Sequence, residues 1–588
     1  MKWPEPEQRA RWKELYSGVH LTWARPNAPG IDMPCRSCAA PGPKPRLLDA
    51  VVTLPLQGTL SSRLLQCPAC GCAFAQDAPA FDYEHNAANE TSVAFYVEVG
   101  AGLWPITRAV ARVEAPPGAR YLEIGCGFGF ALDYATRARG WTGRGIDPSP
   151  IAVAARGKLG LDIQNHYLRR EEAAGENADV VMAGEVVEHM GDPLAFVAIL
   201  RAALKPGGTL VLTTPDRAAL QRDAPLAQIV PVLSVGAHVV LETTDSLRLL
   251  LERAGFAHVE VSSESNQLTA YASDQPLLLE RAPGVIRRRF RQYLDARVPA
   301  TPEKDYVWWG FATRAHQEAV VDGDWNAADR VWPELRAECR RRFGFDLDDP
   351  ATVPSTSGLQ LWELPDRVPK ALPSILYARA LQRMTQHGAS LTELAPLFRA
   401  AATAAVALNE ALRADASEDG ATLGVERSCR AVLAAEAADA GRRDASALLR
   451  EAVAIDPAQA ILLARRSFVG LINAGRFEPA RRLGETWDLR ADALDAQPAG
   501  AALAAAERDM LHSLAMLDLQ SADTWPRAAE RFAHVRDGLP AGDLWWSALR
   551  GECIAADRME KPDHARRLLA EAPADTMPGD LRNRLAQE

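Results

Sequence analysis

A glycine-rich segment near residue 125 combines an acidic residue with three closely spaced glycines. Glu123 precedes Gly125, Gly127 and Gly129 in the run LEIGCGFG. Glycines let a backbone turn sharply between a strand and a helix, and they leave room for a ligand against the main chain and the helix N-terminus. Such a loop alone is compatible with a dinucleotide, a nucleotide or S-adenosylmethionine.

Two carboxylates around this loop narrow the choice of ligand. A dinucleotide fingerprint spaces its glycines as GxGxxG and places a pyrophosphate on the helix end. Here the order is acid-x-Gly-x-Gly-x-Gly, and Glu123 would repel a pyrophosphate but suits a ligand with ammonium and sulfonium groups. Asp147, in the run GIDPSP, falls at the end of the next expected strand, where a carboxylate can accept both ribose hydroxyls.

Five of the nine cysteines lie between residues 35 and 72. Four of them form two CxxC pairs: Cys35, Cys38, Cys67 and Cys70. Each pair brings two sulfurs to one side of a tight turn, which suits one tetrahedral zinc ion with four thiolate ligands. Since four protein ligands close such a site, we expect the zinc to be structural. Cys72 is expected to be a bystander, and the alternative is that it exchanges with one of the four.

The elements that must position these residues follow from the hydrophobic pattern. Short apolar strands alternate with helical stretches over residues 116–272, which predicts an α/β Rossmann-like core with a parallel sheet. Strands are expected at 121–124, 144–147, 162–166, 179–183, 209–213 and 258–262. Helices are expected at 130–139, 193–204 and 246–254. The run KPGG at 205–208 predicts a helix stop followed by a turn.

The remaining composition divides the chain into further regions. We predict a zinc-ribbon-like segment over 1–80, a helical lid or linker over 81–115, a helical connecting region over 273–394 and an all-α repeat region over 395–588. In the last region, similar helical segments carry Gly441 and Gly475, which lie 34 residues apart. That spacing is the period of tetratricopeptide units. The alternative is an irregular helical bundle.

Bulk properties exclude some classes of partner. The net charge is −10, so nucleic-acid phosphates would be repelled on average. The basic run 287–291 is interpreted as a solvated helix face. The polar N-terminus has no apolar signal region and no long apolar run appears, so we expect a cytoplasmic protein without a membrane span. In that reducing compartment, clustered cysteines favour a metal site over disulfides.

Five motifs of the core together resemble class I S-adenosylmethionine-dependent methyltransferases. The resemblance is strongest to the group that contains ubiquinone-biosynthesis O-methyltransferases and sugar methyltransferases. The matching runs, in family order, are LEIGCGFG, GIDPSP, DVVMAGEVVEHMGDP, LKPGGTLVLTTP and LLERAGF. The resemblance implies that Glu123, Gly125 and Gly127 face the methionine moiety and that Asp147 faces the ribose. It also implies that Glu185 holds the methionine end.

Two histidines are candidates for a general base. Methyl transfer to a hydroxyl often needs such a base, commonly histidine. His189 lies just after the fourth expected strand, and His238 lies between the fifth strand and the next helix. The resemblance favours His238, because relatives that act on sugars and quinones often point a histidine of this position at the acceptor. The alternatives are a capping role for His189 and packing under a lid for His238.

Other contacts are left open by the sequence. The adenine contact is expected near His166 or Tyr167, although no clear acid follows the third strand. Tyr83 or Tyr96, ahead of the core, would orient the acceptor or pack between domains.

A cysteine ribbon before such a core resembles C-methyltransferases of deoxysugar biosynthesis and methyltransferases encoded with surface-polysaccharide genes. The first group usually ends in a second Rossmann-like domain, whereas this chain is expected to end in helices. The preferred hypothesis is therefore O-methylation of a sugar in a glycan or glycoconjugate, with the helical repeats available to a glycan or a protein partner. The alternatives are C-methylation of a nucleotide-activated sugar and a scaffold with an inactive core. The intact glycine loop and Asp147 argue against the scaffold.

Overall fold

The structure is a computed structural model of the 588-residue chain. It describes residues 18–25, 30–54, 58–77, 90–99, 104–222, 224, 226–301, 303–414, 419–440, 448, 468, 471–472, 476–481, 501–537, 539–574 and 576–587. The chain forms two compact units. The first consists of Met1–Leu347, Pro354–Ile375 and Ala407–Ala421, and the second of Asp348–Val353, Leu376–Val406 and Thr422–Glu588.

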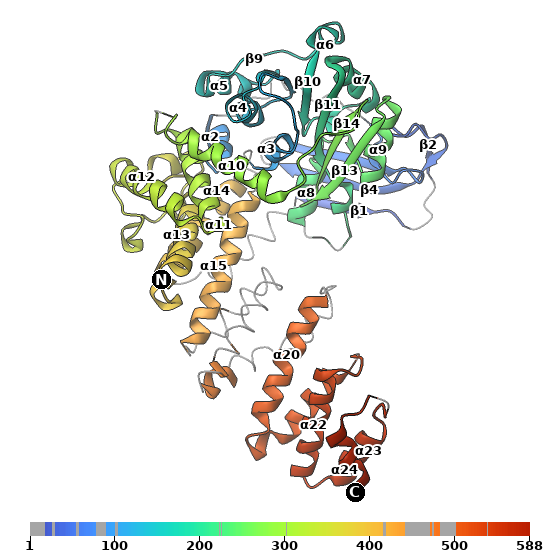
Figure 1. The fold of residues 1–588 in the computed structure, drawn as a ribbon, viewed down its shortest axis with the longest axis vertical. Helices are drawn as coiled ribbons and strands as arrows, with labels where there is room; N and C mark the ends of the chain where they lie inside the picture. Colours follow the sequence, from blue (N-terminus) through green and yellow to red (C-terminus); the bar gives the residue numbers. More distant parts are fainter. Residues whose placement is uncertain are drawn as a thin grey trace. The chain divides into compact units, whose positions relative to one another are not determined.

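A seven-stranded sheet in the order β13-β14-β11-β10-β7-β8-β9 forms the centre of the first unit (Figure 1). Its parallel strands are β7 (Arg120–Ile124), β8 (Thr142–Ile146), β9 (Ile163–Gln164), β10 (Ala178–Gly184) and β11 (Leu204–Pro215). Two antiparallel strands, β13 (His258–Glu264) and β14 (Gln267–Ser273), complete it. The predicted Rossmann-like core is confirmed, and every expected strand overlaps an observed one.

Helices cover both faces of this sheet. On one face, α6 (Arg170–Glu176), α7 (Pro193–Ala203) and α9 (Thr244–Arg253) bury Ala173, Leu200 and Leu250 in one apolar cluster with the strands. Outside this cluster, α4 (Phe130–Arg137) contacts α3 (Trp104–Ala111) and the strands β7 and β8. The helix α5 (Pro150–Leu159) follows β8. Burial of these apolar stripes fixes the sheet and thereby the loops at its carboxyl edge.

The predicted turn at 205–208 is wrong in part. The helix does end nearby, at Ala203, but Lys205–Gly208 belongs to β11 as an irregularity in its pairing. Ala178 pairs with Leu204 and Val180 with Thr209, so the intervening residues bulge out of the ladder. Gly207 takes a φ of 76° there, which the absence of a Cβ permits.

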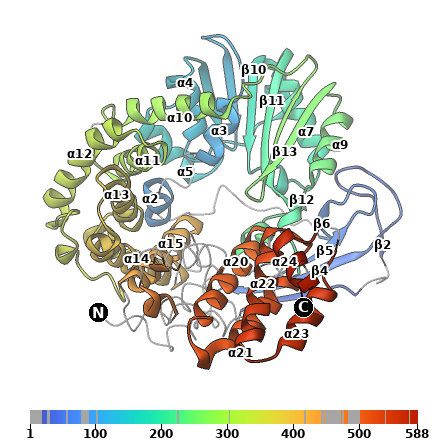
Figure 2. The same cartoon turned by 60° about the horizontal axis from the view of Figure 1, so that its bottom comes forward.

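A second, five-stranded sheet has the order β1-β4-β5-β6-β12. Four strands come from the N-terminal region: β1 (Val19–Trp23), β4 (Arg46–Leu54), β5 (Gly58–Gln66) and β6 (Ala73–Ala75). The fifth, β12 (Val240–Leu241), comes from the segment between β11 and α9 and pairs with β6 (Figure 2). That segment also carries α8 (Leu226–Leu233), which shares an apolar cluster with the cysteines. We call the five-stranded sheet and its cysteine turns the cysteine module.

Further helices complete the first unit. They are α2 (Glu90–Glu98), α10 (Pro283–Arg297), α11 (Tyr306–Asp322) and α12 (Trp325–Phe343). The basic run 287–291 lies on α10 and forms ion pairs within the unit: Arg287 pairs with Glu318, and Arg289 pairs with Glu114. These contacts give the run a structural role.

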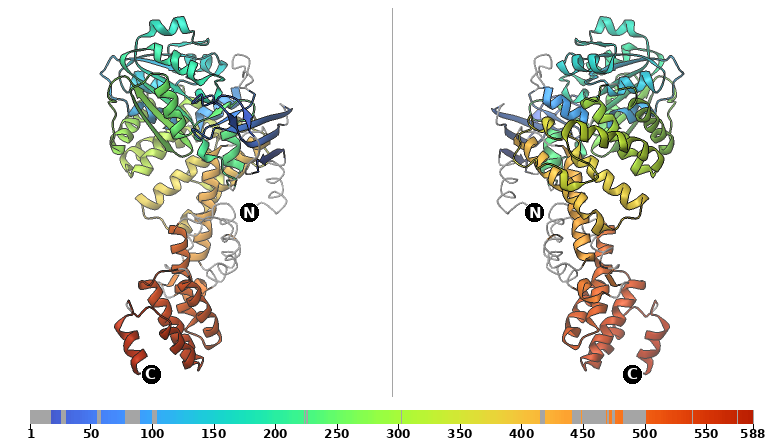
Figure 3. Two further views of the ribbon diagram at one scale, coloured as in Figure 1. Left: turned by 90° about the vertical axis from the view of Figure 1, so that its right-hand side faces the viewer. Right: turned by 90° about the vertical axis from the view of Figure 1, so that its left-hand side faces the viewer.

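The second unit is helical over its described residues. The helices α20 (Ala501–Asp518), α21 (Trp525–Arg536), α22 (Asp543–Arg558), α23 (Pro562–Ala570) and α24 (Gly579–Gln587) pack in sequence order (Figure 3). The predicted helical C-terminal region is confirmed. Gly441 and Gly475, which define the 34-residue spacing, lie outside the described residues, so the repeat stays a prediction.

Three helices precede this bundle in the sequence: α13 (Leu372–Gln386), α14 (Leu391–Ala414) and α15 (Gly420–Asp439). Within the described residues, Leu391–Arg413 alone is long and apolar enough to cross a membrane. Of its most apolar window, 56% is buried inside the protein, as in a core helix.

Candidate functional site

The glycine loop connects β7 to α4 and leaves its backbone open at one position. Gly125 takes a φ of 69°, and a Cβ built there would lie 2.5 Å from the Val186 Cγ2 atom. Gly127 takes a φ of 51°, yet no described atom lies within 4 Å of the position of its Cβ. Gly129 caps α4 with a φ of 76°. Gly125 is therefore required by packing, whereas the Cβ position of Gly127 faces open space.

Glu123 and Asp147 flank this loop. Glu123 is 3% exposed on β7 and accepts a hydrogen bond of 3.0 Å from the Tyr121 hydroxyl. Burial raises the pKa of Glu123 to about 8, and the nearby Asp147 charge adds to the effect. Asp147 follows β8 and accepts hydrogen bonds from the Gly127 amide at 2.7 Å and the Ser149 amide at 2.8 Å. The two carboxylates and the open glycine thus meet at the carboxyl edge of the sheet.

Glu185 follows β10 at the same edge. Its φ of 56° is a left-handed conformation that non-glycine residues seldom adopt and that is often found at functional sites. Its carboxylate accepts a 2.8 Å hydrogen bond from the Gln267 side chain, and burial raises its pKa. Burial, together with the charges of Glu185 and Glu123, raises the pKa of Tyr96.

The two candidate histidines come together although they are far apart in sequence. His189 lies in the short helix η1 (Val187–His189), His238 lies between α8 and β12, and their ring centroids are 4.9 Å apart. The Nδ1 atom of His189 lies 3.0 Å from the Ala237 carbonyl, and that of His238 lies 2.8 Å from the Val232 carbonyl. A carbonyl only accepts, so each neutral ring carries its proton on Nδ1 and leaves Nε2 as an acceptor.

Burial keeps these rings uncharged. It lowers the pKa of His189, and burial together with the adjacent His189 lowers the pKa of His238 to about 4. Burial also raises the pKa of Glu188 well above its usual range, and Thr214 donates a 3.0 Å hydrogen bond to it. One ligand atom from each of Glu188, His189 and His238 lies within 4.8 Å of the others. Such a set can relay a proton or hold a divalent cation.

The other residues that the sequence proposed for ligand contacts are His166, Tyr167 and Tyr83. His166 contacts the Tyr167 carbonyl at 3.0 Å and the Gln164 side chain at 3.1 Å, while Tyr167 is 47% exposed. Tyr83 lies outside the described residues. Sequence reasoning assigned no role to Glu188 or Gln267. Glu188 carried a signal, since it precedes His189 in EVVEHM, but Gln267 carried none.

The cysteines form one cluster beside β12. The Cys35 and Cys70 sulfurs are 3.7 Å apart, the Cys38 and Cys67 sulfurs are 3.6 Å apart, and all four lie within 4.8 Å of one another. A zinc ion with Zn–S bonds of about 2.3 Å needs sulfurs about 3.8 Å apart, so the cluster is compatible with zinc. The Cys72 sulfur lies 3.3 Å from that of Cys35 and 3.5 Å from that of Cys70, so this buried fifth thiol also contacts the cluster.

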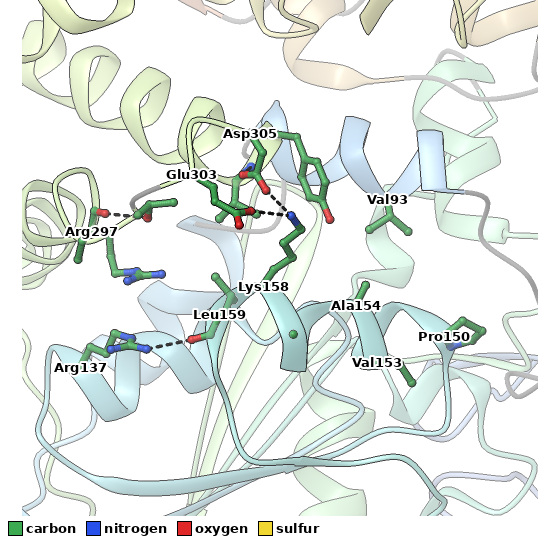
Figure 4. Close-up of a pocket in the computed structure, with 15 residues that line it drawn as sticks. Val93, Arg137, Pro150, Val153, Ala154, Lys158, Leu159, Arg297, Glu303 and Asp305 are labelled. Atoms are coloured by element: carbon green, nitrogen blue, oxygen red, sulfur yellow. Dashed lines mark hydrogen bonds and ion pairs between the residues drawn. The ribbon is translucent and has the colours of Figure 1, made fainter. Parts of the chain in front are cut away.

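A cavity of about 670 Å³ lies elsewhere in the first unit, along α5 (Figure 4). Across it, Lys158 pairs with Glu303 at 3.1 Å and with Asp305 at 2.6 Å. Its lining contains none of the candidate site residues. The chemistry-bearing groups therefore gather at the sheet edge and not in this cavity.

Comparison with known proteins agrees with this geometry. Residues 105–261 match the model of a methyltransferase domain. The chain is 35% identical over 162 residues to a ubiquinone biosynthesis O-methyltransferase of Dinoroseobacter shibae, a match that covers 24% of this chain and 62% of the relative. A relative of the same description from Xanthomonas campestris pv. campestris is 32% identical over 205 residues, covering 34% of this chain and 78% of the relative.

Among solved structures, a SAM dependent methyltransferase from Archaeoglobus fulgidus matches with 16% identity and a TM-score of 0.24, covering 30% of this chain and 92% of that chain. The chain spans less than two thirds of the length of the Dinoroseobacter relative, but more than two thirds of the Xanthomonas one. From the family model, the Xanthomonas match and the carboxylates around the glycine loop, we conclude that the chain belongs to the class I S-adenosylmethionine-dependent methyltransferases.

Proposed function

We propose that this enzyme methylates a hydroxyl of a sugar in a glycan or glycoconjugate, with His238 as the general base. The observation that carries the proposal is the neutral pair of His189 and His238 next to the carboxylates of the glycine-loop edge. Glu188 lies between Glu185 and His189 in the sequence, and one of its carboxylate oxygens lies within 4.8 Å of a ring nitrogen of each histidine.

The residues around the glycine loop would hold the cofactor. Gly125, Gly127 and Gly129 shape the loop, Glu123 and Glu185 would bind the positively charged methionine end, and Asp147 would accept the ribose hydroxyls. When bound, S-adenosylmethionine supplies an electrophilic methyl group. A cation beside Glu123 favours its carboxylate form, so the raised pKa of Glu123 implies that binding releases a proton.

The histidine pair would then act on the acceptor. An uncharged imidazole can accept the hydroxyl proton at Nε2 while the hydroxyl oxygen attacks the methyl group. The Val232 carbonyl holds the His238 ring by Nδ1 and stabilises the charge that forms when Nε2 is protonated. His189, held by the Ala237 carbonyl, is the second candidate.

Support for a sugar acceptor comes from the architecture. The matched relatives are named O-methyltransferases, which supports transfer to oxygen. The cysteine module ahead of the core and the helices behind it favour a glycan acceptor, and the C-terminal helices would bind that glycan or a protein partner. The cysteine module also keeps C-methylation of a nucleotide-activated sugar as the second candidate.

Replacing Asp147 should weaken cofactor binding. Asp147→Ala removes an acceptor of two ribose hydrogen bonds, so we expect affinity to fall on the order of 10- to 100-fold. Calorimetry with S-adenosylmethionine measures this. Asp274→Ala is the matched control, because it removes an ion pair with Arg201 at the edge of the sheet opposite to Asp147. Unchanged affinity in Asp147→Ala would place the ribose elsewhere.

Cofactor binding should be linked to proton release. The pKa of Glu123 is raised to about 8 in the free protein and should drop beside an ammonium group, so affinity should increase as pH rises towards 8. Calorimetry at neutral pH in two buffers of different ionisation enthalpy reports the released proton. Cofactor binding to Glu123→Gln should release no proton. A proton still released by this variant would come from another group.

Replacing His238 should slow turnover without affecting cofactor binding. Loss of a general base costs on the order of 10²- to 10⁴-fold in kcat, and cofactor affinity should be unchanged. Because the pKa of His238 is lowered to about 4, its neutral form persists as pH falls, so kcat should decline only near that value. A decline of kcat near the usual histidine pKa, or full activity in His238→Ala, would show that His238 is not the general base. The base would then be His189, or the reaction would need none.

Metal analysis should find about one zinc per chain in the full-length protein. Cys67→Ser removes one of four thiolate ligands and should abolish tight zinc binding and lower the melting temperature. Cys553→Ser, a buried thiol of the second unit, is the control. Zinc retained in Cys67→Ser but lost in Cys67→Ser/Cys72→Ser would identify Cys72 as a replacement ligand. Zinc retained in both variants would point to Glu188, His189 and His238, and zinc absent from the wild-type protein would reject the site.

A further inference from the structure

The segment that carries His238 is built into the cysteine module. Next to His238, the Val239 carbonyl accepts a 2.8 Å hydrogen bond from the Ala75 amide of the module. The Val239 amide in turn donates a 2.7 Å hydrogen bond to the Glu188 carbonyl, beside His189. One backbone residue therefore joins the module to both histidines.

A buried carboxylate connects the same segment to the first CxxC turn. Glu242 follows β12 and is 0% exposed. Its Oε1 atom accepts a 2.6 Å hydrogen bond from Ser37, and its Oε2 atom accepts one from Ser246 at the start of α9. Ser37 lies between the two cysteines of that turn. Since a buried carboxylate is costly without donors, this pairing favours one arrangement of the turn and the strand.

The other residue between the cysteines of the first CxxC turn, Arg36, reaches the segment that follows His189. The Arg36 guanidinium donates a 2.8 Å hydrogen bond to the carbonyl of Gly191, two residues after His189. It also donates to the Gln76 carbonyl at 3.3 Å, within the module. The second CxxC turn makes a parallel contact, because the Thr243 hydroxyl donates a 3.0 Å hydrogen bond to the Cys70 carbonyl.

We propose that Arg36, Ser37 and Glu242 are positioning residues, which transmit the geometry of the cysteine cluster to His189 and His238. The proposal rests on the proposed function, because it concerns the same histidine pair. With the four thiolates held together, both CxxC turns are fixed, and Arg36 and Ser37 hold the segments on either side of the pair. The cysteine module is then part of the acceptor site.

The catalytic rate should therefore depend on contacts that lie outside the reacting groups. Neither Arg36 nor Ser37 touches a histidine, so their effect must come from displacement of the turn at Gly191 or of the strand at Glu242. A misplacement of about 1 Å at a catalytic group can cost about 100-fold in rate.

The test compares two truncations with two matched controls in full-length protein. Arg36→Ala and Ser37→Ala remove the contacts to the core. Arg63→Ala and Ser61→Ala remove the same side chains from β5 of the same sheet, where Arg63 pairs with Asp49 of the module. Arg36→Lys keeps one charged donor and should fall between Arg36→Ala and wild type. Each protein is assayed for zinc content, S-adenosylmethionine affinity, kcat, KM and the ¹⁵N-imidazole NMR signals of His189 and His238.

We expect Arg36→Ala and Ser37→Ala to shift both imidazole signals and to lower kcat on the order of 10- to 100-fold, with zinc content and cofactor affinity unchanged. The β5 controls should match wild type. Unchanged imidazole signals in both truncations would overturn the proposal, as would shifts that appear only where zinc is lost. The imidazole signals need no acceptor. If they shift while the wild-type protein methylates no glycan, the proposed function fails and the positioning role stands.

Discussion

Ionisable side chains buried at the carboxyl edge of the central sheet impose the main constraint on this protein. A buried carboxyl or imidazole is stable only when it is neutral or has a suitable partner. Glu123 has the Tyr121 hydroxyl, Glu188 has the Thr214 hydroxyl, and each histidine has a backbone carbonyl. The same burial raises the acid pKa values and lowers the histidine pKa values, so these groups are largely uncharged in the free protein.

The hydrogen-bond partners of these buried groups come from parts of the chain that lie far apart in the sequence. The histidine on η1 takes its carbonyl partner from the segment before β12, and β12 belongs to the sheet of the cysteine module. The core and the cysteine module therefore share one structural element. Val239 and Glu242 join the N-terminal region to the segments that carry the two histidines.

Much of this organisation could be predicted from the sequence. The glycine loop, Asp147 and the paired CxxC turns are local patterns, and each is found where its pattern indicates. β14 was missed although Leu268, Ala270 and Ala272 alternate with more polar residues, because alanine favours strands only weakly and the hairpin turn at Ser265 and Asn266 lacks glycine. The KPGG run was misjudged because only pairing with β10 reveals a bulge.

Other features of the site cannot be predicted from local sequence patterns. β12 has two residues, and its pairing with β6 depends on tertiary contacts that no sequence period records. The approach of His189 to His238 and the hydrogen bond from Gln267 to Glu185 arise in the same way. These long-range contacts distinguish a site that can act on an acceptor from one that only holds a cofactor.

The proposed acceptor is tested most directly by mass spectrometry of glycans from cells with and without the gene. We expect one sugar to lose a methyl mass when the gene is deleted and to regain it when the wild-type gene, but not a His238→Ala copy, is restored. Identical glycans in both strains, with the missing methyl group found on a quinone or another small molecule, would contradict it.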